Sequence, residues 1–174
     1  SNDESLKYAV NSLKTSTKHY ISFLNDPNLK NATEMSIASN LAGKAINISK
    51  TTAPHAASYP FTSLFNISHG HAVSLFFENF FRFNYDNLHK SETSFNLKKR
   101  FELIFHLFNV NNINDFDSKI RLIKKNAQLE DNLIKLNINI KKNSEKIISG
   151  INLLRLGNNP IKIVNTDIIN IISK

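Results

Sequence analysis

The chain has 174 residues, a formal net charge of +8, four glycines and no cysteine. Without cysteine it forms no disulfide, zinc–thiolate site or iron–sulfur cluster, and the glycines lack the spacing of common phosphate-binding loops. No apolar run is long enough to cross a membrane and no secretory signal is present, so we expect one cytoplasmic domain over residues 1–174.

Apolar residues recur at helical spacing along most of the chain. A first helix is expected over residues 3–24, with Asp3 or Ser5 as its cap, and the Asn-Asp-Pro-Asn run at 25–28 ends it. A second helix is expected over 29–48, where small residues favour close packing on its neighbours.

The middle of the chain predicts two further helices. The Thr-Thr-Ala-Pro run at 51–54 has the pattern of a helix start, with a threonine cap and proline in the first turn. Pro60 lies inside this helix, which we therefore expect to be short or bent. The Ser-His-Gly-His run at 68–71 begins another helix, which the Asn-Tyr-Asp-Asn run at 84–87 ends.

The second half of the chain also has helical periodicity. The Gly-Asn-Asn-Pro run at 157–160 is typical of a helix stop, and 136–140 is the best candidate for a strand. The fold class we predict is all-α, a multi-helix bundle. Helices are expected over residues 95–108, 118–128, 129–136, 144–156 and 167–173.

Three of the six histidines, His55, His69 and His71, fall within 17 residues. Neutral imidazole is the commonest side-chain ligand of transition metals, and the positive end of a helix disfavours the charged ring. His55 and His69 lie near expected helix starts and are the candidate metal ligands. Two buried, hydrogen-bonded histidines at a helix junction explain the spacing equally. His71 points to a different helix face from His69, which favours a supporting or structural role.

The positive charge admits nucleic acid, an anionic substrate or an anionic cofactor as a partner. The chain is rich in Asn, Lys and Ile together, and this composition alone explains the charge. Its basic residues are spread over several segments without a recognition-helix pattern, so a nucleic-acid-binding helical module is an alternative that we do not favour.

A Leu-Ala-Gly run at 41–43 in a small-residue helix precedes His55, and thirteen residues then separate His55 from the pair His69-Gly70. This pattern resembles the iron-containing alcohol dehydrogenase family. The Asn-Asn-Pro turn at 158–160 is similar to the family's closing segment, and the Thr-Thr-Ala-Pro-His-Ala wording at 51–56 is similar to members that reduce phosphonoacetaldehyde-type substrates.

The resemblance implies the C-terminal helical domain of an enzyme whose nucleotide-binding domain is absent from this chain. It implies an Fe(II) site, with Zn(II) as a competitor, in which His55 and His69 are two ligands and a DAxxH motif supplies the others. It also implies NAD(P) as cofactor and a small alcohol or aldehyde as substrate. The similarity to the phosphonoacetaldehyde-reducing members and the positive net charge favour an anionic substrate. No DAxxH motif occurs here, so the chain holds half of such a site.

Tyr59 stands four residues after His55, where many family members carry a histidine near the nicotinamide and the substrate. The resemblance therefore implies that Tyr59 contacts substrate or relays a proton. A phenol, with an ordinary pKa near 10, suits a relay less well than an imidazole near 6.5. Packing beside Pro60 is the alternative.

For the chain by itself we expect weak metal binding and no dehydrogenase activity. The face that the nucleotide-binding domain covers in full-length members is expected to be exposed, which favours a homodimer. The alternative function is a helical scaffold or oligomerisation domain without catalytic activity.

Overall fold

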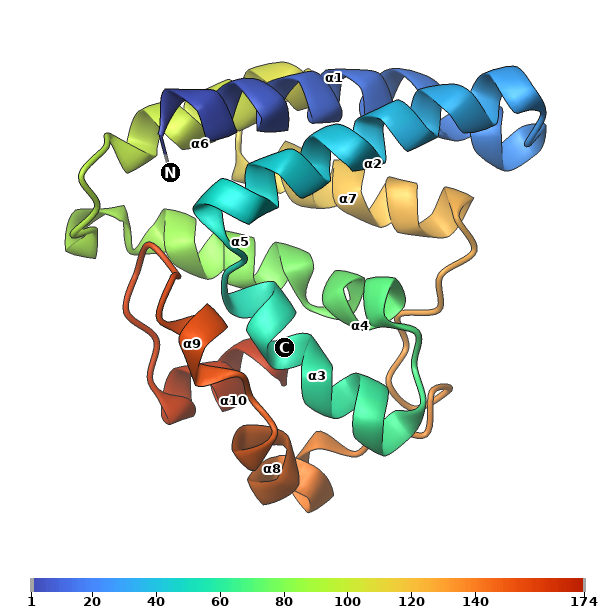
Figure 1. Cartoon of the computed structure of the whole chain (residues 1–174). Coiled ribbons are helices and arrows are strands. Elements are labelled where there is room, and N and C mark those ends of the chain that lie inside the picture. Colours follow the sequence, from blue (N-terminus) through green and yellow to red (C-terminus); the bar gives the residue numbers. More distant parts are fainter. Residues whose placement is uncertain (1, 174) are drawn as a thin grey trace.

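Figure 1 shows the computed structural model, which describes residues 2–173. Every regular element in this range is a helix, which confirms the all-α prediction. In chain order the elements are α1 Asp3–Asn25, α2 Leu29–Ser49, α3 Ala53–Phe65, α4 His69–Leu75, α5 Phe77–Asp86, the 3-10 helix η1 Leu88–Lys90, α6 Leu97–Phe108, α7 Ile113–Asn126, α8 Ile140–Ser149, α9 Leu153–Leu156 and α10 Asn165–Ile172. None of these helices is both long and apolar enough to cross a membrane.

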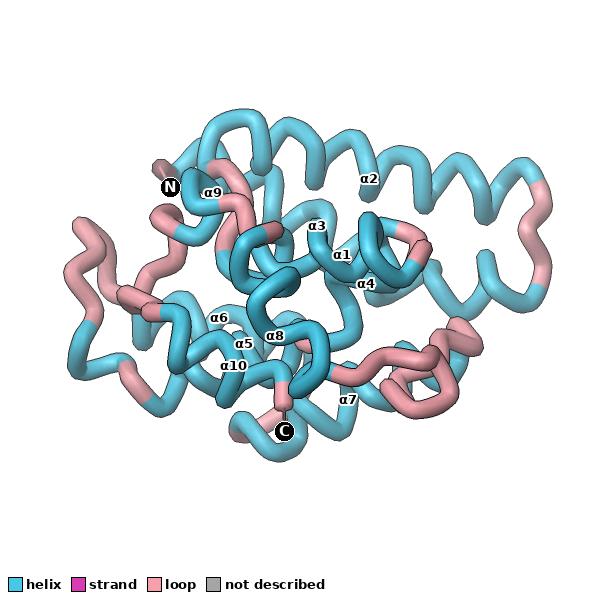
Figure 2. Tube along the Cα trace, turned by 90° about the horizontal axis from the view of Figure 1, so that it is seen from below, coloured by secondary structure: helices cyan, strands magenta, loops and turns pink. Residues whose placement is uncertain are grey.

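The long helices α1 and α2 pack side by side as a hairpin along the upper edge of the molecule in Figure 1, with α6 beside α1, and α3, α8, α9 and α10 lie on the lower side, which faces the viewer in Figure 2. One apolar cluster surrounds the fully buried Phe61 of α3 and receives side chains from α4, α5, α8 and α10. A second cluster joins α5, α6 and α7, where the rings of Phe81 and Phe116 stack with centroids 4.2 Å apart. Helix α3 therefore lies at the centre of the first cluster.

The helix starts are set by asparagine caps more often than the sequence suggested. Asn2, rather than Asp3 or Ser5, caps α1, and its Oδ1 accepts the Ser5 N–H at 2.9 Å. Helix α7 begins at Ile113, earlier than expected, because the Asn112 side chain already accepts two backbone N–H groups.

The loop between α7 and α8 contains neither the helix expected at 129–136 nor the strand expected at 136–140, so both predictions are wrong. Gln128 and Asn137 adopt φ of 54° and 57°, in the left-handed region that interrupts a helix. Ile138 and Ile140 both enter the core, which explains the apolar alternation, but the described residues offer no partner strand.

Two helices that were expected to be continuous are divided. The helix expected from residue 68 is interrupted at Phe76, between α4 and α5. The helix expected over 144–156 is interrupted after Gly150, between α8 and α9. A Cβ at Gly150 would stand 3.0 Å from the Pro60 Cβ, which is tighter than an ordinary contact, so glycine lets α8 end this close to α3 without a shift of Pro60.

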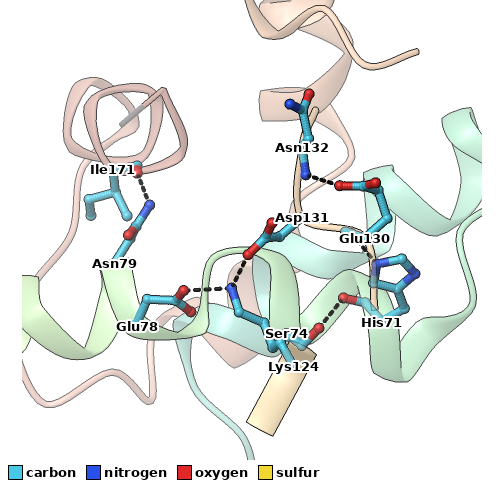
Figure 3. Close-up of polar contacts among 9 residues, drawn as sticks. All are labelled: His71, Ser74, Glu78, Asn79, Lys124, Glu130, Asp131, Asn132 and Ile171. Atoms are coloured by element: carbon cyan, nitrogen blue, oxygen red, sulfur yellow. Dashed lines mark hydrogen bonds and ion pairs between the residues drawn. The ribbon is translucent and has the colours of Figure 1, made fainter. Parts of the chain in front are cut away.

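Polar contacts fasten the loop between α7 and α8 to the helices beneath it (Figure 3). Lys124 of α7 lies 2.5 Å from Glu78 of α5 and 3.3 Å from Asp131 of the loop. His71 Nε2 lies 2.6 Å from the backbone oxygen of Glu130 and donates to it, because a carbonyl only accepts. This contact gives His71 a structural role.

Candidate functional site

The chain reverses direction between α3 and α4 and brings His55 and His69 together. His55 is the third residue of α3 and His69 the first of α4. Asn66, which ends α3, has a left-handed φ of 53° that turns the chain back. The two imidazole centroids lie 5.6 Å apart with an interplanar angle of 61°. The pair that the sequence singled out is thus formed within a single helix–turn–helix unit.

The surroundings of His55 favour its neutral form. Its side chain is half-buried, whereas His69 is exposed. Burial lowers the pKa of His55 below its ordinary value, and repulsion from His69, when that ring is protonated, and from Arg155 lowers it further. A neutral imidazole keeps one nitrogen lone pair, which leaves His55 able to bind a metal ion.

The fully buried Ser58 lies between the two histidines and orients the second one. Its hydroxyl donates to the backbone oxygen of His55 at 2.8 Å and lies 3.4 Å from Nδ1 of His69. Because the hydroxyl has a single proton and the shorter contact uses it, the arrangement favours the His69 tautomer that carries its proton on Nδ1. Nε2 of His69 then carries the free lone pair, as a metal ligand requires.

Tyr59 belongs to the same cluster. The centroid of the Tyr59 ring lies 5.8 Å from the centroid of the His69 ring. The guanidinium carbon of Arg155 lies 5.6 Å from the same Tyr59 centroid. Tyr59 is half-buried, so part of its side chain is exposed at this surface. The three candidate residues His55, His69 and Tyr59 thus share one surface of α3 and α4.

Pro60 determines what packs against this surface. A proline has no N–H for the carbonyl four residues earlier, which here belongs to Ala56. That carbonyl instead accepts the backbone N–H of Asn152 at 3.3 Å, and Asn152 is the cap of α9. Helix α3 does not end at Pro60 but continues to Phe65, and the carbonyl that Pro60 leaves free accepts from the cap residue of α9.

Arg155 is a member of this cluster that the sequence did not reveal. Its backbone N–H is held by the Asn152 side chain at 3.0 Å, and its guanidinium donates to the buried hydroxyl of Thr51. Asn158 also donates to the backbone oxygen of Thr51, at 3.2 Å. The only sequence signal for Arg155 was its place just before the Gly-Asn-Asn-Pro stop, which says nothing about its distant partner.

The described residues supply an incomplete set of metal ligands. They contain no group of three or more His, Asp or Glu side chains placed to hold one metal ion. His55 and His69 nevertheless have suitable chemistry, with a lowered pKa in one and an oriented ring in the other. The two histidines therefore fit half of a metal centre.

Known structures share this fold. An archaeal halo-thermophilic alcohol dehydrogenase from a Red Sea brine pool, in an H277A mutant, superposes with a TM-score of 0.84 at 18% identity, covering 97% of this chain and 44% of its own. A sulfoacetaldehyde reductase from Bifidobacterium kashiwanohense, in complex with NAD+, gives a TM-score of 0.82 at 22% identity, covering 99% of this chain and 43% of its own.

The chain thus spans less than half the length of these similar structures. A comparison with curated protein sequences gives no match. The sequence pattern itself matches the model of the Fe-containing alcohol dehydrogenase family, C-terminal, over residues 5–174. Because this match includes the paired histidines and nearly the entire chain, the protein belongs to the C-terminal part of the Fe-containing alcohol dehydrogenase family.

Proposed function

We propose that this chain is the metal-binding helical domain of an NAD(P)-dependent, metal-dependent alcohol dehydrogenase or aldehyde reductase. The observation that carries the proposal is the contact of His55 and His69, whose rings lie 5.6 Å apart on neighbouring helix starts. Family membership and the likeness to a reductase bound to NAD+ support the same reaction class.

Each residue of the cluster has a distinct part in this proposal. His55 and His69 hold Fe(II) or its competitor Zn(II), and Ser58 keeps the His69 Nε2 lone pair available. When bound, a divalent metal supplies Lewis acidity and NAD(P) supplies or accepts the hydride. Tyr59 faces the same surface, where it donates a hydrogen bond to a small alcohol or aldehyde.

The remaining ligands and the nucleotide-binding domain must come from outside these residues, so the chain alone is proposed to lack dehydrogenase activity. Leu153 and Leu154 of α9, beside the cluster, are 71% and 86% exposed. Apolar side chains this exposed suit a face that another domain or a second copy covers.

The test is a titration of Fe(II), under anaerobic conditions, and of Zn(II) into the purified chain. We expect weak binding of one ion, abolished by His55→Ala and by His69→Ala. Ser58→Ala should weaken it about tenfold, as losses of ligand-orienting hydrogen bonds do. His106→Ala, which removes an exposed histidine of α6, is the matched control. Binding that is equal in all variants would refute the site.

The second candidate is a helical scaffold without catalytic activity, and the incomplete ligand set favours it. The metal titration and the oligomeric state of the histidine variants distinguish the two functions. A scaffold would bind no metal through His55 or His69 and would keep its oligomeric state in both alanine variants.

A further inference from the structure

The loop between α9 and α10, on the left of Figure 1, contains a short segment in extended conformation. Burial alternates along it, because Ile161 and Ile163 are buried whereas Lys162 and Val164 are exposed. This period of two is that of a β-strand, and Val164 has extended φ and ψ of −106° and 166°. Residues 161–164 therefore have the conformation of a single strand within a helical protein.

The core holds this segment in place. The Ile161 side chain enters the apolar cluster of α5, α6 and α7, and the Ile163 side chain enters the cluster around Phe61. A segment anchored in both clusters has already lost the freedom that an unanchored loop would lose on binding. It is therefore preorganised to receive a partner.

One edge of this strand is free at Lys162. In a strand, the N–H and C=O of one residue point to one edge and those of the next residue to the other edge. The edge of Ile161 is occupied by the Asn159 side chain, which donates to the Ile161 oxygen at 2.7 Å. On the opposite edge Val164 already donates to Asp167 at 3.0 Å, but neither the N–H nor the C=O of Lys162 is hydrogen-bonded within residues 2–173. Lys162 thus offers both groups that a hydrogen-bonded pair of antiparallel strands exchanges.

A cleft of about 720 Å³ lies beside the segment. Its walls include residues 161–163, Leu153 and Leu156 of α9, and Lys90 and Glu92 at the end of η1 and in the loop that follows. None of the candidate metal-site residues lines this cleft, so it is separate from the proposed metal centre. It gives an added strand space along the segment, and the exposed Leu153 gives it an apolar contact.

The charges of the cleft select the kind of strand that fits. Lys90, Lys162 and Glu92 line it, and no ion pair in the described part of the chain includes any of them. Antiparallel pairing with a second copy through the free groups of Lys162 would set two Lys162 side chains opposite each other. Like charges directly opposite are destabilising, so the cleft favours a strand that carries a carboxylate over a second copy of this chain.

We propose that the segment 161–163 is a docking site for an extended, acidic segment of a partner protein, which adds to it as a β-strand. The inference goes beyond the proposed function and does not depend on the metal site. Main-chain hydrogen bonds to Lys162 hold the added strand, and its carboxylates pair with the Lys162 and Lys90 ammonium groups. Alternate apolar side chains of the added strand contact Leu153.

The test is a titration of the full chain with short synthetic peptides capped at both ends, followed by backbone amide NMR and hydrogen exchange. One peptide alternates valine with glutamate, and a second alternates valine with lysine. A third is the N-methylated form of the first, which keeps its charges but has no backbone N–H. We expect the glutamate peptide to bind most tightly and to slow the exchange of the Lys162 amide. The Ile163 amide points to the opposite edge and should be unaffected.

Variants of Lys162 separate its charge from its backbone. Lys162→Gln should weaken binding of the glutamate peptide about fivefold, as the loss of an exposed ion pair does. Lys162→Glu should reverse the preference, so that the lysine peptide binds more tightly. Lys14→Glu makes the same change at an exposed position on α1 and should leave both affinities unchanged. Circular dichroism and the thermal midpoint confirm that each variant is folded.

Equal binding of the glutamate and lysine peptides, or of the glutamate peptide and its N-methylated form, would overturn the inference. So would a wild-type chain that binds none of the peptides. Protection of the Lys162 amide that rises with protein concentration, without any peptide, would assign the segment to self-association instead. The metal titration with His55 and His69 variants is independent of these results, so either proposal can fail without the other.

Discussion

Lys124 and Glu78 form the most deeply buried ion pair among the described residues, with side chains 5% and 6% exposed and 2.5 Å between Nζ and Oε1. The other carboxylate oxygen of Glu78 is buried without a hydrogen-bond partner. We predict that Lys124→Met destabilises the protein severely, because it leaves a carboxylate in the core with no counter-charge.

The loss of stability in Lys124→Met has an upper limit, because a buried carboxylate without a counter-charge can take up a proton instead. For an acid with an ordinary pKa near 4.3, protonation at pH 7 costs about 3.7 kcal/mol. Lys124→Met should approach this value, which corresponds to a decrease of about 7–15 °C in Tm for a domain of this size. Asp131, the second partner of Lys124, is half-exposed and lies 3.3 Å away, so Asp131→Asn should cost no more than about 1 kcal/mol.

Urea unfolding of the single variants Glu78→Met and Lys124→Met and of the double variant Glu78→Met/Lys124→Met provides the assay, and Asp131→Asn is measured beside them. The double variant removes both charges and keeps the volume, so it should lie within about 1 kcal/mol of the wild type. The reasoning is refuted if Lys124→Met costs less than about 1 kcal/mol, or if the double variant loses as much as the two single variants together.

Three further predictions concern the site and its support. The folded chain holds the pKa of His55 below 6.5, chiefly through burial, so the unfolded chain binds that proton more readily and stability should fall as the pH drops below 6.5. His69→Ala should move the His55 pKa, read from its ring-proton NMR titration, upward toward 6.5, and a downward shift would contradict the assigned cause. Gly150→Ala should destabilise the chain by about 1–3 kcal/mol in urea, because the new Cβ meets Pro60 at 3.0 Å. Gly157→Ala, whose Cβ finds its nearest neighbour at 3.4 Å, is the control, and equal losses would refute the argument.

Much of the fold was predictable because the signals of a helix lie within a few residues of one another in the sequence. The apolar spacing in α1 and α2 and the proline in the first turn of α3 predicted helices close to those observed. The predictions were wrong where the local sequence pattern and the tertiary packing disagree. The segment 129–139 has apolar residues at plausible intervals, but left-handed backbone at Gln128 and Asn137 makes it a loop.

The candidate site was predictable in part for the same reason. His55, Tyr59 and His69 lie within one short stretch of sequence, and a single turn at Asn66 is enough to bring them together. The tautomer of His69 was not predictable, because it depends on which way the Ser58 hydroxyl points. The Ser58 hydroxyl points to the backbone oxygen of His55, to which it donates.

The sequence by itself determined the helical class, the histidine pair and the resemblance to the family that residues 5–174 match. Only the tertiary structure revealed that Arg155 joins the pair, through a bond to Thr51 from 104 residues away. The physical reason is the range of the interactions. Helical periodicity and short motifs act over a few residues, whereas the partner of the carbonyl freed by Pro60 is selected by how α3 and α9 pack.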